Sequence, residues 1–431
     1  MTDADRPLPT ASRRGFLLGA AGLGAAAAVT GLAPAAQAAP PGHVPAVTAA
    51  PAAPVAATRR RGGFVTAAGG QFRLAGKEFR FGGTNTYYLH QRSHYMINAA
   101  LNDAAAMSLG VVRAWAFADG PTNDRPLQPE PFVYDEDAFD SLDHTVAQAG
   151  ELGLRLVLTL TNNWPDYGGM PQYVSWLLGL PDDVYDTAVN HDKFYTTPAI
   201  KDCYKAYAKH VIRRRNRYTG LRYGEDPTIM TFELANEPRN RSDKTGAAVL
   251  SWVAEMSAYV KSLAPRQLVA VGDEGFYGDA AATDYPYSNY EGDQWRKFVA
   301  LPHVDYGTVH LYPDSWGETA DPVGWGTRWI NDHLADGRRL GKPVVLEEYG
   351  LRVPPDGGVA ARDAGYAAWT AAVEAGGAGD QFWLLTSRVD DGSFYPDYDG
   401  FRVIWNNDPA NPGRSTAQLL ADHARRMAGG A

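Results

Sequence analysis

The chain has 431 residues, a length that a single large barrel domain with insertions can use. Its formal net charge of −9 argues against a nucleic-acid-binding protein, because such proteins carry basic surfaces. Cys203 is the one cysteine, so an intramolecular disulfide is excluded and stability must come from a large core. The eleven Trp and twenty-three Tyr suit that core, and they also suit a site that stacks flat apolar faces such as sugar rings.

The first segment is typical of an export signal. Arg13 and Arg14 form a twin-arginine pattern, an Ala/Gly-rich apolar run extends to Leu32, and residues 36–38 read Ala-Gln-Ala, an A-x-A cleavage site. The apolar run is short and weakly hydrophobic for a spanning helix, which disfavours a membrane anchor. We therefore expect residues 1–38 to be a twin-arginine signal peptide, and the mature protein to be secreted without a membrane attachment.

The rest of the chain divides into a linker and one domain. Residues 39–61 are rich in Ala and Pro and low in complexity, which predicts a disordered linker. Residues 62–431 contain no repeat of the length that solenoid proteins use. We expect this region to be a single catalytic domain.

Past Gly62, short β-rich apolar runs alternate with longer helical patterns. Eight strands are expected, at residues 79–87, 111–117, 154–160, 228–235, 267–271, 305–311, 343–347 and 381–385. Helical patterns follow most of them, for instance at residues 135–152, 198–215, 247–263, 327–340 and 359–375. Eight such units in one domain predict an α/β fold, a (β/α)8 TIM barrel. Residues 64–65 and 72–74, joined through Gly69-Gly70, predict a short N-terminal β-hairpin before the barrel.

In a TIM barrel the chemistry lies at the carboxyl ends of the strands, so the residues there are the candidates. The second strand carries Arg113 and Trp115 on one face. A buried Arg needs a carboxylate partner, and Arg113 with Glu233 can be interpreted as an internal ion pair and nothing more. The remaining strand ends contribute Trp164 after the third, His310 and Tyr312 on one face of the sixth, and Trp383 on the eighth.

The fourth and seventh strands each end in a glutamate. Alternation along the fourth strand turns Glu233 and Glu237 inward, whereas Asn236 has the wrong parity and reaches the cleft only if the strand bends. Pro238, two residues further on, makes that bend plausible. The seventh strand presents Glu348, and its neighbour Glu347 has the opposite parity.

Two carboxylates that face each other across a barrel mouth are what glycoside hydrolysis requires, one as a proton donor and one ionised. Taken singly, each of these residues is more often structural, and their convergence on one mouth is what favours catalysis. A metal site is the competing use of Glu and His. The sequence has no H-E-x-x-H pattern, so we expect no metal and no cofactor.

At these residues the chain resembles glycoside hydrolase family 5, and within it the endo-β-1,4-mannanase subfamily. Asn-Glu-Pro at 236–238 is typical of the family, and the Asn-Asn-Trp loop with Gly-Gly favours mannanases over cellulases. The matching stretches are residues 83–89, 112–115, 162–164 with 168–169 and 172–173, 215–220, 226–230, 233–239, 309–314 with 316, and 341–350. Together they cover essentially everything after Gly62.

The resemblance implies a role for each site residue. Glu237 would be the acid/base and Glu348 the nucleophile of a retaining double displacement. Asn236 would bind the 2-hydroxyl of the reacting sugar. The other implied substrate-site residues are Arg113 and Tyr312 beside the nucleophile, His310 near the acid/base, Trp383 under the reacting sugar, and Trp115 and Trp164 as cleft aromatics. The expected partner is a mannan, galactomannan or glucomannan, bound by a monomer.

Three alternatives remain open at this point. An exo-acting β-mannosidase shares the catalytic motifs and differs in loops that close one end of the cleft, for which residues 167–195 and 387–401 are candidates. A β-1,4-glucanase would share the fold and the two glutamates. A non-catalytic carbohydrate-binding barrel is disfavoured, because it would keep the aromatic residues and lose a carboxylate.

Overall fold

The computed structural model describes residues 63–180, 187–353, 359–406 and 411–429. The predicted signal peptide and linker, residues 1–61, lie outside the described residues. Within the described ranges, none of the helices is long and apolar enough to cross a membrane.

Eight parallel strands form one sheet in the order β8-β7-β6-β5-β4-β11-β10-β9. The strands are β4 (Phe81–Asn85), β5 (Val111–Trp115), β6 (Arg155–Thr159), β7 (Ile229–Glu233), β8 (Leu268–Ala270), β9 (Gly307–Leu311), β10 (Val344–Tyr349) and β11 (Gly379–Phe382). All eight predicted strands are present, and each is buried along its length because helices cover its outer face. The last strand begins at Gly379, two residues before its predicted start.

Backbone contacts between β8 and β9 close the sheet into a barrel. The amide of Asp305 donates to the carbonyl of Val269 at 2.8 Å, at the beginning of the two strands. At their carboxyl ends, the amide of His310 donates to the carbonyl of Glu274 at 3.0 Å. These bonds join the two edges of the sheet, so the predicted (β/α)8 barrel is confirmed.

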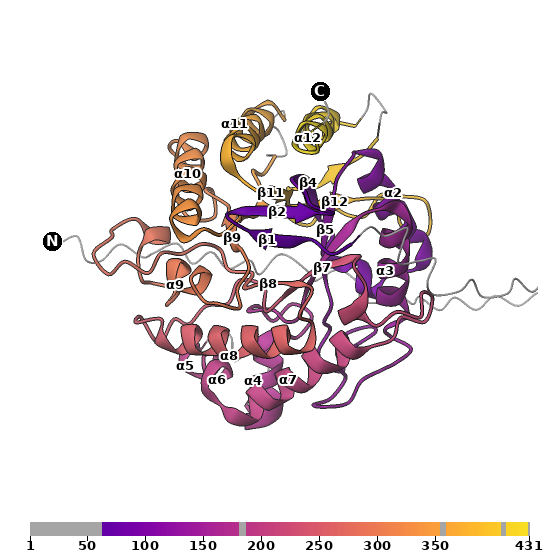
Figure 1. Ribbon diagram of the computed structural model, residues 1–431, viewed down its shortest axis with the longest axis vertical. Helices are drawn as coiled ribbons and strands as arrows, with labels where there is room; N and C mark the ends of the chain where they lie inside the picture. Colours follow the sequence, from indigo (N-terminus) through magenta and orange to yellow (C-terminus); the bar gives the residue numbers. More distant parts are fainter. Residues whose placement is uncertain (1–62, 181–186, 354–358, 407–410, 430–431) are drawn as a thin grey trace, which may run out of the picture.

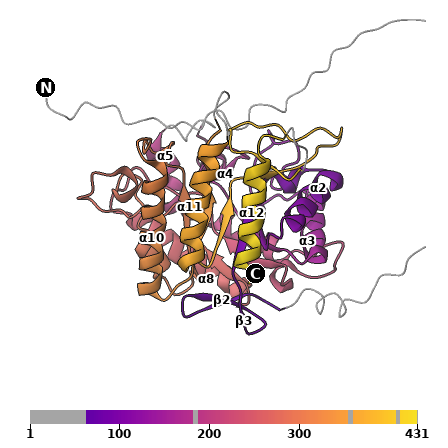
Figure 2. The same ribbon diagram turned by 90° about the horizontal axis from the view of Figure 1, so that it is seen from above.

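Helices surround the barrel (Figure 1), and α10, α11 and α12 stand side by side along its outside (Figure 2). Local sequence sets their ends: α10 has Pro322 at its first position, the side chain of Asp321 accepts from the amide of Gly324, and Gly341 ends the helix at a φ of 66°. The longer helices are α2 (His94–Ala106), α3 (Asp140–Leu152), α4 (Gly169–Leu178), α7 (Pro198–Arg213), α8 (Ala247–Leu263), α10 (Pro322–Leu340), α11 (Ala360–Gly376) and α12 (Arg414–Met427). Short helices are α5 (Ala188–His191), α6 (Lys193–Thr196) and α9 (Trp295–Val299).

A small antiparallel sheet covers the amino-terminal end of the barrel (Figure 2). It contains the predicted hairpin as β1 (Thr66–Ala68) and β2 (Gln71–Leu74), and adds a third strand, β3 (Lys77–Glu78). Phe72 of β2 is buried against barrel residues, and its ring lies 5.2 Å from that of Tyr306. This apolar contact seals the end of the barrel opposite the predicted site.

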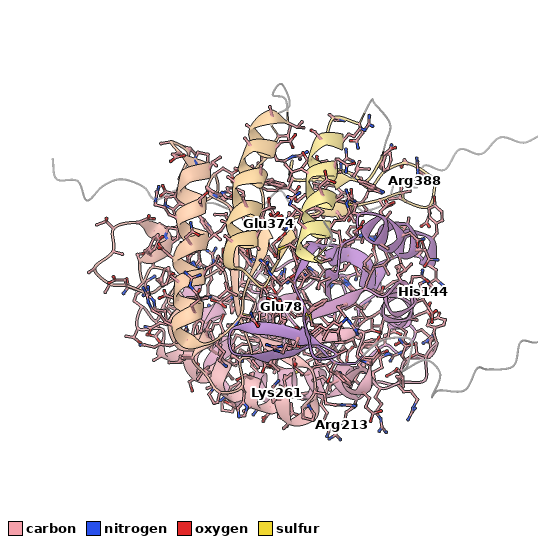
Figure 3. All side chains as sticks on the ribbon, turned by 45° about the horizontal axis from the view of Figure 1, so that its top comes forward. Glu78, His144, Arg213, Lys261, Glu374 and Arg388 are labelled. Carbon is pink, nitrogen blue, oxygen red and sulfur yellow. The ribbon has the colours of Figure 1, made fainter. Side chains whose placement is uncertain are left out.

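The last helix is held to the barrel by a buried polar contact. His423 of α12 bonds Asp380 of β11 through Nε2, and Glu374 of α11 through Nδ1 at 2.7 Å. Glu374 lies where α11 faces α12 (Figure 3). Burial alone would lower the pKa of His423, but Asp380 and Glu374 raise it above its ordinary value.

Candidate active site

Arg113, in the middle of β5, lies fully buried among the acidic side chains of the site. Its Nη2 donates to Oε1 of Glu233 at 2.7 Å and its Nε donates to Oε2 at 3.0 Å. The same guanidinium donates through Nη1 to Glu348 at 2.5 Å and to Asn85 at 3.0 Å. Burial opposes the charge, but Glu233, Glu347 and Glu348 raise the pKa of Arg113 well above its ordinary value. The predicted ion pair with Glu233 is present, and Arg113 also holds a second carboxylate.

The regular strand β7 ends at Glu233, before Asn236, so the backbone departs from strict alternation as the prediction for Asn236 required. Asn236 accepts from Nη2 of Arg113 at 2.7 Å, so its side chain does enter the site. Glu237 has a φ of 48°, in the left-handed region, and its amide donates to Gly272 at 2.8 Å. A side chain at Gly272 would lie 2.0 Å from the carbonyl of Ala235, so this close approach requires glycine.

Both oxygens of Glu237 have a hydrogen-bond partner. The indole N–H of Trp164 donates to Oε2 at 2.6 Å, and Nδ1 of His310 lies 2.9 Å from Oε1. Glu237 and His310 are fully buried. Trp164 therefore contacts the predicted acid/base itself, a more specific position than that of a general cleft aromatic.

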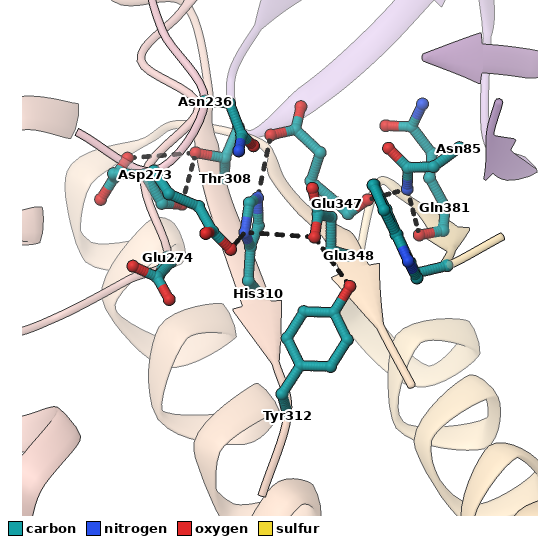
Figure 4. Close-up of polar contacts among 12 residues, drawn as sticks. Asn85, Asn236, Asp273, Glu274, Thr308, His310, Tyr312, Glu347, Glu348 and Gln381 are labelled. Atoms are coloured by element: carbon teal, nitrogen blue, oxygen red, sulfur yellow. Dashed lines mark hydrogen bonds and ion pairs between the residues drawn. The ribbon is translucent and has the colours of Figure 1, made fainter. Parts of the chain in front are cut away.

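Glu348 has a different set of partners. The hydroxyl of Tyr312 donates to Oε2 at 2.7 Å (Figure 4). Nη1 of Arg113 donates to Oε1. Two donors, one of them cationic, thus meet this carboxylate, which is the environment that an ionised group needs. The structure places Glu348, Tyr312 and Arg113 together as the sequence predicted.

The prediction that Glu347 faces away from the site, with a parity opposite to that of Glu348, is wrong. The register between β10 and β9 shifts between Leu346 and Glu348, so β10 has one extra residue there and strict alternation fails. Glu347 is fully buried inside the barrel, with Oε2 3.5 Å from Nε2 of His310 and 3.7 Å from Nε of Arg113. Two consecutive glutamates therefore face the site, with His310 beside both (Figure 4).

Glu237, His310 and Glu348 form a group of potential metal ligands. One nitrogen of the histidine and one oxygen of each glutamate all lie within 4.8 Å of one another. By geometry alone such a group could hold a cation. These atoms already bond Trp164, Tyr312, Arg113 and each other, so hydrogen bonds within the protein account for the arrangement.

The pKa values of His310 and Glu347 are both raised, which favours the charged form of the histidine and the neutral form of the glutamate. Burial would lower the pKa of His310, but Glu348, Glu237 and Glu347 raise it to about 10. Burial and the nearby Glu233 raise the pKa of Glu347 to about 8, against the opposing effect of Arg113 and His310. The direction of these shifts favours the charged form of the imidazole and the uncharged form of the neighbouring carboxyl.

Aromatic residues lie beside the acidic residues. The ring of Trp383 stacks on that of Tyr87 with 5.3 Å between centroids, and its N–H donates to Asp399 at 2.9 Å. The ring of Trp115 lies 6.3 Å from that of Trp383 and 4.8 Å from the Arg113 guanidinium. The structure thus brings two of the three predicted tryptophans, Trp115 and Trp383, close together, with Trp115 against Arg113.

Sequence reasoning missed three residues of this site. Asn85 ends β4, accepts from Arg113 and donates to the carbonyl of Glu347 at 2.8 Å; its position at a strand end was the available signal. Tyr87 supports Trp383, and it lies in the stretch 83–89 that carried the resemblance. Glu347 was predicted to face away from the site, because no residue pattern in the sequence indicates the bulge in β10.

A (β/α)8 barrel with two closely spaced carboxylates at its carboxyl end, each bonded differently, has the architecture of a glycoside hydrolase. Comparison with known proteins gives the family. Residues 62–371 match the family model described as GH family 5 beta-mannosidase-like. The chain belongs to glycoside hydrolase family 5.

Named relatives resemble the chain over most of its length. Mannan endo-1,4-beta-mannosidase 1 of Solanum lycopersicum is 36% identical over 382 residues, which cover 85% of this chain and 92% of the relative. The endo-beta-1,4-mannanase of Thermotoga petrophila has a TM-score of 0.73 at 40% identity, covering 82% of this chain and 78% of that one. The endo-1,4-beta-mannanase of Rhizomucor miehei has a TM-score of 0.74 at 34% identity, covering 85% and 99%.

Proposed function

We propose that the protein is a retaining endo-β-1,4-mannanase that hydrolyses internal bonds of mannan-type polysaccharides. The observation that carries the proposal is the pair Glu237 and Glu348, whose nearest oxygens lie within 4.8 Å and whose partners differ. Retaining glycosidases have their two carboxyl groups about 5–5.5 Å apart, and inverting ones about 6.5–9.5 Å apart, to admit a water. The short approach supports retention.

The partners of each carboxyl support its role. Glu348, bonded by Arg113 and Tyr312, is the carboxylate that attacks the anomeric carbon. Glu237 gives its proton to the oxygen of the departing sugar, and a mannosyl–enzyme ester forms on Glu348. In the second step Glu237, now a carboxylate, takes a proton from water, and that water displaces Glu348 with the original configuration restored.

Two features support a mannan substrate. The relatives above are named for endo-1,4-β-mannosidase activity, and the similarity extends over more than four-fifths of this chain. Asn236, held by Arg113 at 2.7 Å and donating to Asn162 at 3.0 Å, is the residue that would meet the sugar 2-hydroxyl, which is axial in mannose.

A product profile on mannohexaose tests the proposal. We expect a mixture of short oligomers, because an endo enzyme cuts internal bonds. Mannose as the sole early product would indicate an exo-acting β-mannosidase instead. Higher initial rates on carboxymethylcellulose than on mannan would indicate a β-1,4-glucanase, and no turnover of either would leave a carbohydrate-binding barrel.

We also propose that the protein is exported by the twin-arginine route and acts outside the cytoplasm. Arg13-Arg14 and the Ala-Gln-Ala sequence at 36–38 support this proposal. That route carries proteins that have already folded in the cytoplasm. This agrees with a chain that has a single, buried cysteine and therefore forms no intramolecular disulfide.

A further inference from the structure

Glu347 is a fully buried carboxyl group that takes no part in the proposed double displacement. Among the residues that the structure describes, neither of its oxygens has a hydrogen bond, and neither has Nε2 of His310. These atoms face each other instead, with 3.5 Å between Oε2 and Nε2. A buried ionised carboxylate without a hydrogen-bond donor carries a heavy desolvation cost. The stability of this pair therefore depends on which of the two groups is charged.

His310 connects Glu347 to the proposed acid/base. Its Nε2 faces Glu347, and its Nδ1 lies 2.9 Å from Oε1 of Glu237. A neutral imidazole carries a proton on one nitrogen alone, whereas an imidazolium donates from both. A doubly protonated His310 would therefore satisfy Glu347 and Glu237 at the same time.

The charges of the six groups linked by these ion pairs support this state. Nitrogen–oxygen distances of 2.5 to 3.7 Å link two cations to four carboxyls: Arg113 and His310 to Glu233, Glu237, Glu347 and Glu348. Two cations balance two anions, so two of the carboxyls have to be protonated for the group to be neutral. Arg113 bonds Glu233 and Glu348 directly, and the first chemical step requires a proton on Glu237. Glu347 is the remaining carboxyl.

The same balance holds through the second step. Once Glu348 has become an uncharged ester, Glu237 has lost its proton and is the anion. The group again contains two cations and two anions, provided that His310 stays charged and Glu347 stays neutral. No charge has to enter or leave the buried site during the cycle.

We propose that Glu347 is a positioning residue that remains a neutral carboxylic acid and accepts the Nε2–H of His310, which keeps His310 an imidazolium that donates its Nδ1–H to Glu237. The inference rests on the acid/base role proposed for Glu237. The shifted pKa values of His310, about 10, and of Glu347, about 8, point the same way. The other ionisable groups that face Glu347 are Glu233, Arg113 and Tyr306.

Two substitutions of Glu347 test whether this residue acts as a neutral hydrogen-bond acceptor, as a charged group or only as a residue that fills space. Glu347→Gln keeps a carbonyl oxygen that can accept from His310, so kcat/KM on mannohexaose should fall less than about threefold. Glu347→Leu removes the acceptor and should lower kcat/KM by about 10²-fold, within the range of general acid–base effects. For an aryl β-mannobioside with an activated leaving group, Glu347→Leu should cost far less, since that leaving group needs little protonation. An equal loss on both substrates, or a glutamine variant as poor as the leucine variant, overturns the proposal.

A spectroscopic measurement tests the same idea without turnover. In the wild-type protein at pH 7, 15N NMR should show both ring nitrogens of His310 protonated, with the signals assigned by their loss in His310→Asn. Glu347→Gln should keep that state and Glu347→Leu should lose it. A neutral His310 ring in the wild-type protein contradicts the proposal, even if Glu237 proves to be the acid/base.

The control is a carboxyl of the same kind outside this group. Asp293 is buried, and in the described part of the structure neither of its oxygens has a hydrogen bond. Asp293→Asn should leave the His310 signals and the leaving-group dependence as they are in the wild-type protein. If this control changes them as Glu347→Leu does, the effect belongs to buried carboxyls in general, and the specific role of Glu347 is refuted.

Discussion

The indole N–H of Trp164 donates to Oε2 of Glu237 at 2.6 Å. Because His310 holds the other oxygen at 2.9 Å, the carboxyl group of Glu237 is fixed from both sides. Trp164 is itself held: the guanidinium of Arg239 lies 5.1 Å above its ring, and Arg239 bonds Glu274 through two nitrogens at 2.6 and 2.7 Å. Trp164 thus positions a carboxyl group in addition to offering an aromatic surface.

Trp164→Phe should lower kcat on mannan by about tenfold, a fraction of the 10²–10⁴-fold contributed by general acid–base catalysis. The phenyl ring keeps much of the aromatic surface but removes the donor to Glu237. The first step on an activated aryl mannoside should be much less affected, because it needs little acid assistance. Equal losses on both substrates would assign Trp164 to substrate stacking alone.

Azide should distinguish the roles proposed for Glu237 and Glu348. Glu237→Ala removes the proton donor and the later base, so an activated aryl mannoside should give a burst of phenol and an accumulated mannosyl–enzyme. Azide needs no general base and should rescue this variant with β-mannosyl azide as product. Glu348→Ala should abolish turnover, and azide should then give the α-azide by direct attack on the opposite face. NMR of the products identifies each anomer, and exchanged anomers would mean exchanged roles.

The neighbouring glutamate provides a check on the choice of nucleophile. Since both Glu347 and Glu348 face the site, contact alone does not separate them, but Tyr312 and Nη1 of Arg113 bond Glu348. Glu347→Ala should therefore still form a mannosyl–enzyme with an activated substrate, detectable by mass spectrometry. A variant that forms none, together with an active Glu348→Ala, would reverse the assignment.

Activity should survive dialysis against EDTA. Glu237, His310 and Glu348 have the spacing of a cation site, but hydrogen bonds within the protein already occupy these groups, and the proposed double displacement uses no metal. Rates on mannan before and after chelation check this expectation. Turnover that is lost with EDTA and restored by a divalent ion, at an unchanged Tm, would show a catalytic metal.

His423 should make the stability of the domain depend on pH. Because its pKa is raised in the folded protein, its contribution is fully present below the unfolded value of about 6.5 and is lost as the pH rises through the folded value. His423→Gln should cost about 3 kcal/mol of unfolding free energy at pH 6, as for a broken buried ion pair. Denaturant titrations at several pH values should show a smaller difference at high pH. A difference that grows with pH would contradict the sign.

Replacing Arg13 and Arg14 with lysine should block export of the protein. The twin-arginine pair is the feature that the export route reads, and lysine keeps the charge while it changes the side chain. Immunoblots of the culture medium and the cells measure the outcome, and N-terminal sequencing of the secreted wild-type protein should begin near Ala39. Undiminished secretion of the variant would refute the proposed route.

Local patterns in the sequence determined most of the architecture and the identity of the main candidates. Alternating apolar runs predicted eight strands, because a strand buried inside a barrel has a recognisable composition whatever its neighbours are. The position of residues at strand ends then selected Arg113, His310 and Tyr312, since the fold brings all carboxyl ends to one side. The structure places these three side chains within one hydrogen-bonded group with Glu237 and Glu348.

Tertiary structure decided where strict alternation ends. The bulge that turns Glu347 inward depends on the pairing of β10 with β9. The left-handed φ of Glu237 depends on the close approach of the segment at Gly272. Both contacts come from residues that are far away in the sequence. Closure of the barrel through Asp305 and His310 is likewise a contact between separate strands. The raised pKa of His310 depends on the carboxyl groups of Glu348, Glu237 and Glu347, which come from two distant parts of the chain that no local pattern brings together.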